Sequence, residues 1–222
     1  MEMKTRVYEM AHSPYCIPIT QALTACGVDF ERVVVPNWDR GEVIRLTKGA
    51  YYQVPVLQRD ETLVYESSAD SIDVARYVDT HFANGRLFPI EWAGIQEIVI
   101  DFIENDLELR SFKLVDPYYC DEIDDLENRI QVIRHKERRF GRGCVEQWRA
   151  SRERIRAEFD ELVTRFQASL MKKPFLFGDV PLYADFALYG VIGNLTFNNW
   201  NKLNEHQADL KEWAERLEGY RF

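Results

Sequence analysis

Hydrophobic and polar positions change their period several times over the first eighty residues. Apolar, β-branched runs at Thr5 to Met10 and Phe30 to Val35 predict two strands, and Cys16 to Ala25, ended by Gly27, predicts a helix between them. A polar stretch follows, in which a short helix is expected over Arg40 to Lys48. The chain therefore starts in the order strand, helix, strand, helix.

Two further short apolar runs, Val54 to Leu57 and Thr62 to Tyr65, flank Arg59-Asp60-Glu61 and predict a β-hairpin. The second run leads into Glu66-Ser67 and a helix that is expected to reach about Phe82. Residues 1–82 are thus predicted to form one small α/β unit.

Beyond this unit the pattern is helical almost throughout. Residues 83–90 have no clear period and contain Asn-Gly and a proline, so they are predicted to be a linker. Residues 91–222 are predicted to form an all-α domain with helices over 145–170, 183–192 and 206–217. One apolar stripe is expected to be buried, and it consists of Ile95, Ile98, Val99, Phe102 and Ile103.

Composition narrows the classes of function. The 222 residues carry 28 basic and 37 acidic side chains, a formal net charge of −9, which disfavours nucleic acid as a partner. No segment approaches the roughly 18 uncharged apolar residues of a membrane span, and the start lacks a signal-type apolar run, so a cytoplasmic location is expected. The four cysteines are far apart, which favours reduced thiols and no structural metal.

The stretch Ser13-Pro14-Tyr15-Cys16 stands where the first strand turns into the first helix. Serine is a good N-cap and proline fits the first helical position. The free N–H groups and dipole of a helix start favour an anion, for example a thiolate. Lowering a thiol pKa from about 8.5 by two units requires about 2.7 kcal/mol. From these residues alone the stretch is a thiol site, a hydroxyl site or only a helix start.

Two other pieces suit an extended, acidic ligand. A cis peptide at Val54-Pro55 would leave the Val54 backbone free to pair with such a ligand as a neighbouring strand would. Glu66-Ser67 precedes a helix, with Ser67 as the expected N-cap and Asp70 three positions later as in a capping box. This second helix start is suited to a carboxylate.

In order and spacing, these three pieces resemble the glutathione transferase family, and the resemblance spans nearly the whole chain. Leu87-Phe88-Pro89 resembles the linker of that family, and Gly178-Asp179 with Ala184-Asp185-Phe186 resembles the start of its core C-terminal helix. The resemblance implies a thioredoxin-like N-terminal domain, an all-helical C-terminal domain and a homodimer. It also implies glutathione as co-substrate, no metal, and a small hydrophobic electrophile as second substrate.

The resemblance also implies roles for individual residues. Ser13 would be the catalytic residue that donates to the glutathione sulfur, as in serine-type, bacterial-looking members. Gln53, Val54 and Pro55 would hold the cysteinyl and glycyl parts, and Glu66 with Ser67 the γ-glutamyl part. The chain departs from the family pattern at three places, which are Ile17 in place of Arg, Leu182 in place of a hydroxyl cap, and Tyr51-Tyr52-Gln53 before Pro55.

Alternatives remain open at the level of sequence. Cys16 occupies the place of a resolving cysteine, which leaves a glutathione-dependent thiol reductase or lyase as one alternative and a non-catalytic binding module as another. His12 is expected to point away from Ser13. By the resemblance, Asp101, Asp106, Tyr118 and Tyr119 would form the wall of the second-substrate pocket. The charge run from Asp124 to Arg139 is expected to be a solvated helix face or an interface rim.

Overall fold

A computed structural model describes residues 4–67 and 72–222. The α/β part forms a four-stranded sheet in the order β2-β1-β3-β4, in which β1 pairs in parallel with β2 and antiparallel with β3. Its elements are β1 (Thr5–Glu9), α1 (Cys16–Ala25), β2 (Glu31–Val34), α2 (Gly41–Leu46), β3 (Val56–Arg59), β4 (Thr62–Val64) and α3 (Asp73–Val78), which a π-helical turn continues over Asp79–Ala83. The predicted strand and helix order is confirmed.

Both faces of this sheet are buried, because alternate residues of the central strands point to opposite sides. Val7 and Leu57 belong to the large core that the sheet shares with α1, α3 and the helical part. Tyr8 and Val56 belong to a second cluster with Val43 of α2 on the other side. The ends of β1 and β3 therefore lie between two packed layers, and the residues that follow β1 start at a rigid edge.

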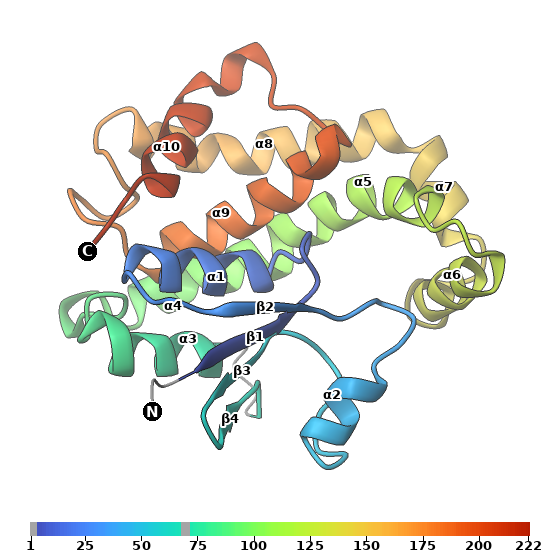
Figure 1. The fold of residues 1–222 in the computed structure, drawn as a ribbon. Coiled ribbons are helices and arrows are strands. Elements are labelled where there is room, and N and C mark those ends of the chain that lie inside the picture. The colour runs from blue at the N-terminus through green and yellow to red at the C-terminus, as the bar shows by residue number, and fades with distance from the viewer. Residues whose placement is uncertain (1–3, 68–71) are drawn as a thin grey trace.

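The second part of the chain is helical and lies along one side of the sheet, next to α1 (Figure 1). Its helices are α4 (Ile95–Phe102), α5 (Glu108–Asp121), α6 (Leu126–Phe140), α7 (Cys144–Ala150), α8 (Arg152–Leu170), α9 (Tyr183–Thr196) and α10 (Ala208–Glu218). This confirms an α/β thioredoxin-like domain followed by an all-α domain. The domain limits at residues 82 and 91 stay a prediction.

The predicted buried stripe of α4 is wrong in part. Ile95 and Ile98 are exposed, whereas Gln96 and Ile100 are buried. The reason is a pair of hydrogen bonds, since the Gln96 side chain donates to the Leu87 carbonyl at 3.2 Å and accepts from the Ala184 N–H at 3.0 Å. These bonds turn the polar residue inward, and the two isoleucines are turned toward solvent.

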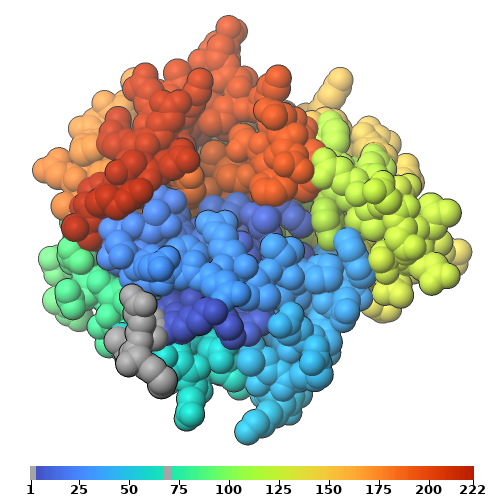
Figure 2. Space-filling view, viewed as in Figure 1, coloured from blue at the N-terminus to red at the C-terminus, as the bar shows by residue number. Residues whose placement is uncertain are grey.

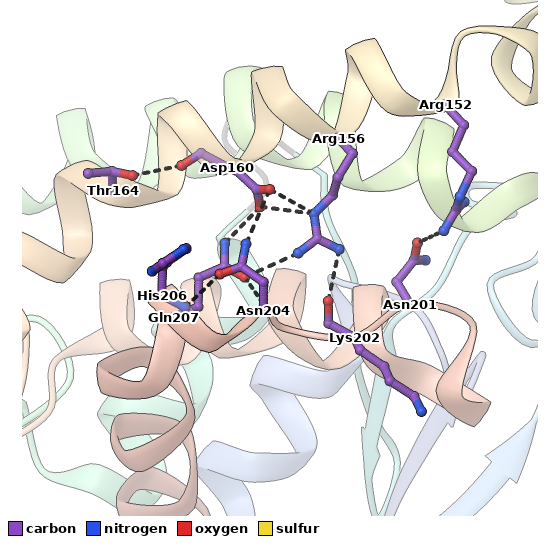
Figure 3. Close-up of polar contacts among 9 residues, drawn as sticks. All are labelled: Arg152, Arg156, Asp160, Thr164, Asn201, Lys202, Asn204, His206 and Gln207. Atoms are coloured by element: carbon purple, nitrogen blue, oxygen red, sulfur yellow. Dashed lines mark hydrogen bonds and ion pairs between the residues drawn. The ribbon is translucent and has the colours of Figure 1, made fainter.

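The predicted helix over 145–170 is two helices, α7 and α8, that meet at Ser151 with φ −102° and ψ 12°. A polar network then fixes the segment before α10 against α8 (Figure 3). Arg156 donates to Asp160 at 2.9 Å, to the Lys202 carbonyl at 2.8 Å and to the Gln207 side chain at 3.2 Å. Because Gln207 in turn donates to Asp160 at 2.7 Å, the network closes on itself.

The α/β part and the helical part meet most closely where α1 crosses α9. A methyl group at Gly190 of α9 would lie 2.2 Å from the Pro14 carbonyl oxygen and 2.7 Å from Pro18 Cδ. One turn farther, the Asn194 side chain donates to the His12 carbonyl at 2.6 Å. Helix α9 thus holds the 12–18 stretch at a fixed distance that only glycine permits.

We expect Gly190→Ala to lower the free energy of unfolding by about 3 kcal/mol or more, because the added methyl overlaps backbone and a stiff proline ring. Gly193→Ala is the matched control, since its methyl would meet only the Ile17 side chain, at 3.2 Å and 3.4 Å. Alanine's helix propensity offsets that milder contact by about 1 kcal/mol. Urea unfolding measures both variants, and equal stability of the two would contradict this account.

Candidate functional site

A cavity of about 820 Å³ lies between the two parts of the chain. One side is formed by segments that connect to the strands of the sheet, with Ser13 after β1, Arg40 after β2 and Gln53 before β3. The other side is formed by α5 and α6, including Glu108, Phe112 and Arg139. In Figure 2 the residues after β2, in light blue, meet the yellow-green atoms of this helical side at the right of the molecule. The cavity is large enough for a tripeptide-sized ligand and a small second molecule.

Ser13 lines this cavity and is only 3 % exposed. Its hydroxyl oxygen accepts the N–H of Tyr15 at 3.2 Å and the N–H of Cys16 at 3.3 Å. Ser13 therefore caps the start of α1, as predicted, although the regular helix begins only at Cys16. Because both lone pairs of the oxygen are engaged by helix N–H groups, the remaining function of the hydroxyl is to donate its own proton.

Cys16 has a different environment, although it is only three residues away. Its side chain is 0 % exposed, and it does not line the cavity. Burial raises the pKa of the Cys16 thiol to about 12, against a smaller lowering effect of the Ser13 hydroxyl. Since the thiolate is the reactive form, Cys16 has the properties of a packed core thiol.

The residues before β3 lie on the cavity wall. The Val54-Pro55 peptide bond is cis, as the resemblance implied, and Gln53 and Val54 line the cavity. Within residues 4–67 and 72–222 the backbone of Val54 makes no hydrogen bond. Buried backbone groups are nearly always paired, so the Val54 N–H and carbonyl are suited to pairing with an extended ligand.

Glu66 and Ser67 are occupied with the start of α3. The Glu66 carboxylate accepts the N–H groups of Asp73 at 2.7 Å and Val74 at 3.3 Å, and Ser67 donates its N–H to the Asp73 carboxylate at 2.8 Å. Burial raises the pKa of Glu66 to about 7. Asp70, the predicted partner of Ser67, lies outside the described residues. Neither Glu66 nor Ser67 lines the cavity that holds Ser13.

His12 is an aromatic packing residue, and the structure gives no sign of a Ser/His pair. Its ring lies 4.4 Å from the ring of Tyr119 and 5.4 Å from that of Trp200, measured between centroids. Burial, together with the cations Lys136 and Arg40, lowers the pKa of His12 to about 4. The imidazole is therefore neutral at physiological pH.

The helical wall of the cavity differs from the sequence prediction. Of the helix residues around α5, the cavity is lined by Glu104, Asn105, Glu108, Leu109, Phe112 and Asp116, and by none of Asp101, Asp106, Tyr118 and Tyr119. A π-helical turn over Ile103–Leu107 changes the rotation of the chain before α5, which a regular 3.6-residue period did not anticipate.

The charge run from Asp124 to Arg139 is only partly a solvated face. Lys136 turns inward, where its ammonium lies 2.6 Å from the Asp116 carboxylate and 4.3 Å from the centre of the Phe112 ring. Burial raises the pKa of Asp116, and Lys136 opposes that shift. This buried ion pair anchors α6 to α5, so that other side chains of α6 form a cavity wall. In the sequence, the signal for this wall was the excess of basic over acidic residues in α6.

Arg40 closes the opposite side. It donates to Asn37 Oδ1 and to Met10 Sδ, each at 3.2 Å, while its Nη1 is buried without a partner among the described residues. Burial lowers the pKa of Arg40. The unpaired N–H groups of Nη1 on this half-buried side chain are suited to an anion in the cavity.

Two negative findings concern the described residues only. Within 4–67 and 72–222 no group of three or more His, Cys, Asp or Glu side chains is arranged to hold a metal ion. In the same part of the chain no helix is both long enough and apolar enough to cross a bilayer.

Family models match two parts of the chain. The model described as glutathione S-transferase, N-terminal domain, matches residues 12–81, and that described as glutathione S-transferase, C-terminal domain, matches residues 149–221. No curated protein matches the sequence.

Solved structures share the whole fold at low sequence identity. Glutathione transferase GSTFuA3 from Phanerochaete chrysosporium superposes with a TM-score of 0.80 at 17% identity, with 99% of this chain and 98% of that chain covered. Glutathione S-transferase CsGST83044 of Ceriporiopsis subvermispora, in complex with glutathione, gives 0.77 at 17%, covering 98% and 97%. Glutaredoxin 2 from Salmonella typhimurium, in complex with glutathione, gives 0.72 at 19%, covering 96% and 92%.

We expect His12 to make stability depend on pH. The unfolded imidazole titrates near 6.5 and the folded one near 4, so the unfolded state binds the extra proton between these values. The stabilising contribution is complete above pH 6.5 and is lost as pH falls toward 4. From pH 7 to pH 5 this loss amounts to about 2 kcal/mol.

The measurement compares urea unfolding of the wild type and His12→Phe at both pH values. Phenylalanine keeps the ring contacts with Tyr119 and Trp200 but cannot titrate. The buried carboxyls of Asp185 and Glu66 also titrate, and the difference between the two proteins cancels their contribution. If the wild type and His12→Phe differ in free energy of unfolding by the same amount at pH 7 and at pH 5, then His12 is not held neutral.

Proposed function

Because the chain belongs to the glutathione transferase family by both its N-terminal and its C-terminal domain, we propose that it joins glutathione to a small electrophile. The thiol of glutathione first loses its proton to solvent. The thiolate then attacks the electrophilic carbon, the C–S bond forms, and the leaving group departs with the electron pair of the broken bond. The protein contributes by stabilising the thiolate and by holding it close to its target.

One observation carries the proposal, namely the hydroxyl of Ser13 at the edge of the cavity. Its oxygen already accepts two N–H groups of the α1 start, so the hydroxyl acts as a donor, and an anion in the cavity would compete for its proton with the buried Cys16 sulfur. The same N–H groups polarise the hydroxyl and strengthen that donor. A hydrogen bond to a charged group is worth about 1.5–3 kcal/mol, which lowers a thiol pKa by about one to two units.

The rest of glutathione is assigned to residues of the cavity wall and to the start of α3, which lies outside that wall. The free N–H and carbonyl of Val54, beside Pro55, pair with the cysteinyl backbone, and Gln53 contacts the glycyl end. Glu66 and Ser67 take the γ-glutamyl end at the start of α3, as the resemblance implies. The pKa of Glu66 is raised to about 7, so its carboxyl is partly ionised near neutral pH, where it meets the γ-glutamyl end.

A second candidate function uses Cys16 for thiol-disulfide exchange. What favours it is the fold shared with a glutaredoxin and the Ser-Pro-Tyr-Cys stretch. What opposes it is the complete burial of Cys16 and its raised pKa. A third candidate, a binding module without catalysis, would need the cavity but not the hydroxyl of Ser13.

We also propose a homodimer. Three isoleucines at and before the start of α4 are exposed in the single chain, with Ile90 at 85%, Ile95 at 57% and Ile98 at 70%. Ile95 and Ile98 are three positions apart on one helix face, so a second copy that covers them would remove apolar surface from water.

For the dimer we expect Ile98→Glu to shift the mass measured by light scattering from two chains to one, because a carboxylate would be buried without a partner. Glu97→Gln, at the neighbouring position, is the control for a change of charge on α4. A wild type that is one chain at all concentrations would contradict the dimer.

For catalysis we expect Ser13→Ala to lower kcat/KM near neutral pH by about 10- to 100-fold and to raise the apparent pKa of the pH profile by about one to two units. Ser13→Thr keeps the hydroxyl and is expected to restore most of the rate. Cys16→Ala is expected to leave both quantities unchanged. A Cys16→Ala variant without activity, beside an active Ser13→Ala variant, would instead establish thiol exchange.

A loss of the N-cap alone is a separate effect, worth about 1 kcal/mol of stability. The rates are therefore compared at a temperature where circular dichroism shows that all three variants are folded. A pH profile of Ser13→Ala identical to that of the wild type would mean that Ser13 is only a helix cap.

A further inference from the structure

The wall that α6 contributes to the cavity has a charge opposite to that of the chain as a whole. The chain has a formal net charge of −9. Helix α6, Leu126–Phe140, nevertheless carries five basic and two acidic residues. Its cavity-lining side chains include Arg134, Lys136, Arg138 and Arg139. Such a concentration of positive charge in an acidic protein calls for an anion near it.

Two of these cations are in ion pairs with carboxylates of the protein and two are not, although the charge of Arg139 lowers the pKa of Glu108. Lys136 pairs with Asp116 and Arg134 pairs with Glu137. Arg138 and Arg139 have no carboxylate within ion-pair distance among residues 4–67 and 72–222. Arg138 donates to Nδ1 of His135 at 3.4 Å, and the guanidinium of Arg139 lies 5.1 Å from the Phe140 ring. Both guanidinium groups therefore keep N–H donors for a ligand.

The cations of the two cavity walls act on a common region. His135 lines the cavity, and its pKa is lowered by burial and by the charges of Lys136, Arg138, Arg40 and Arg139. Arg40 comes from the α/β side and the others from α6, so the positive groups converge from both sides. The neutral imidazole adds no further charge, and its Nδ1 accepts from Arg138.

The same helical wall also carries carboxyl groups, on α5 and on the turn before it. Glu104 and Glu108 line it, and burial raises the pKa of Glu108 to about 7. Arg138 and Arg139 form no ion pair among residues 4–67 and 72–222, so they are the groups of this wall that attract an anion. A neutral apolar molecule would gain nothing from their charge.

We propose that the second substrate is an electrophile that carries a carboxylate, held by Arg138 and Arg139 while its reactive carbon faces Ser13. This inference rests on the proposed transferase function and replaces a purely hydrophobic second substrate by an anionic one. Ser13 lies on the α/β wall and the two arginines lie on α6, so a ligand bound to both extends across the cavity. In the reaction the carboxylate keeps its charge and only anchors the molecule.

The test uses two electrophiles of equal shape, 4-(chloromethyl)benzoate and 4-nitrobenzyl chloride. In both, the C–S bond forms at the benzylic carbon and chloride leaves with the electron pair of the C–Cl bond. Each kcat/KM is divided by the uncatalysed rate constant with glutathione, because the nitro group changes intrinsic reactivity. We expect the wild type to favour the benzoate by about 10-fold or more, since a hydrogen-bonded charge contributes about 1.5–3 kcal/mol.

The double variant Arg138→Met with Arg139→Met is expected to lose this preference, mainly through KM, and to keep its rate with 4-nitrobenzyl chloride within about twofold, because a neutral substrate does not use the charge. The control is Arg45→Met with Arg154→Met, which removes the same charge at two exposed positions outside the cavity. Equal loss with both electrophiles, or no preference in the wild type, would overturn the inference.

Calorimetry separates this inference from the proposed function. The ligands are 4-nitrobenzoate and neutral 4-nitrobenzamide, and neither can react with glutathione under these conditions. If the benzoate binds more tightly than the benzamide and this preference disappears in the Arg138/Arg139 variant, the anion site is supported. If no conjugation is found in that case, only the transferase function is overturned. Conjugation of 4-nitrobenzyl chloride without any arginine-dependent binding of benzoate keeps that function and overturns the anion site.

Discussion

The close approach of α9 to Pro14 and Pro18 decides where the groups of the cavity lie. Gly190 has no room for a methyl group against the Pro14 carbonyl oxygen, and Asn194 holds the His12 carbonyl one turn farther along the same helix. These two contacts flank Ser13 on both sides in sequence. The hydroxyl is therefore positioned by the helical part of the chain as much as by the sheet from which it emerges.

Around this fixed point, the polar groups divide into those that the fold satisfies and those that it leaves for a ligand. The Ser13 oxygen, Lys136 and Arg134 have internal partners. Nη1 of Arg40 is buried without one among the described residues. An unpaired buried donor lowers the stability of the fold by about 1–3 kcal/mol. Such a donor is therefore expected where a bound molecule accepts its hydrogen bond.

The sequence predicted the fold well because its signals are local. The alternation of strands and helices, the hairpin between Arg59 and Thr62 and the start of α1 each follow from neighbouring residues. The place of Ser13 at a helix start was predicted for the same reason. The roles of Ser13, Gln53, Val54, Pro55, Glu66 and Ser67 in binding glutathione stay proposals.

What the sequence could not predict depends on contacts between distant residues. The hydrogen bonds of Gln96 to Leu87 and Ala184 turned Ile95 and Ile98 outward, against an apolar stripe that favoured the opposite face. The π-helical turn before α5 moved the cavity wall from Asp101 to Glu104 and Glu108. The inward turn of Lys136 was not predicted, whereas Arg134, Arg138 and Arg139 of the same helix are exposed, as expected for a solvated helix face or an interface rim.

The central claim is that the cavity holds glutathione as its thiolate beside Ser13. Calorimetric titration at pH 7 in two buffers of different ionisation enthalpy measures directly how many protons are released when glutathione binds. A thiol pKa lowered by one to two units from about 8.5 leaves the bound thiol partly to mostly ionised at pH 7, so the account predicts that glutathione releases about 0.2 to 0.7 of a proton more than S-methylglutathione, whose sulfur has no proton to lose. Equal proton release with the two ligands would contradict it, because the thiol of glutathione would then remain protonated in the complex.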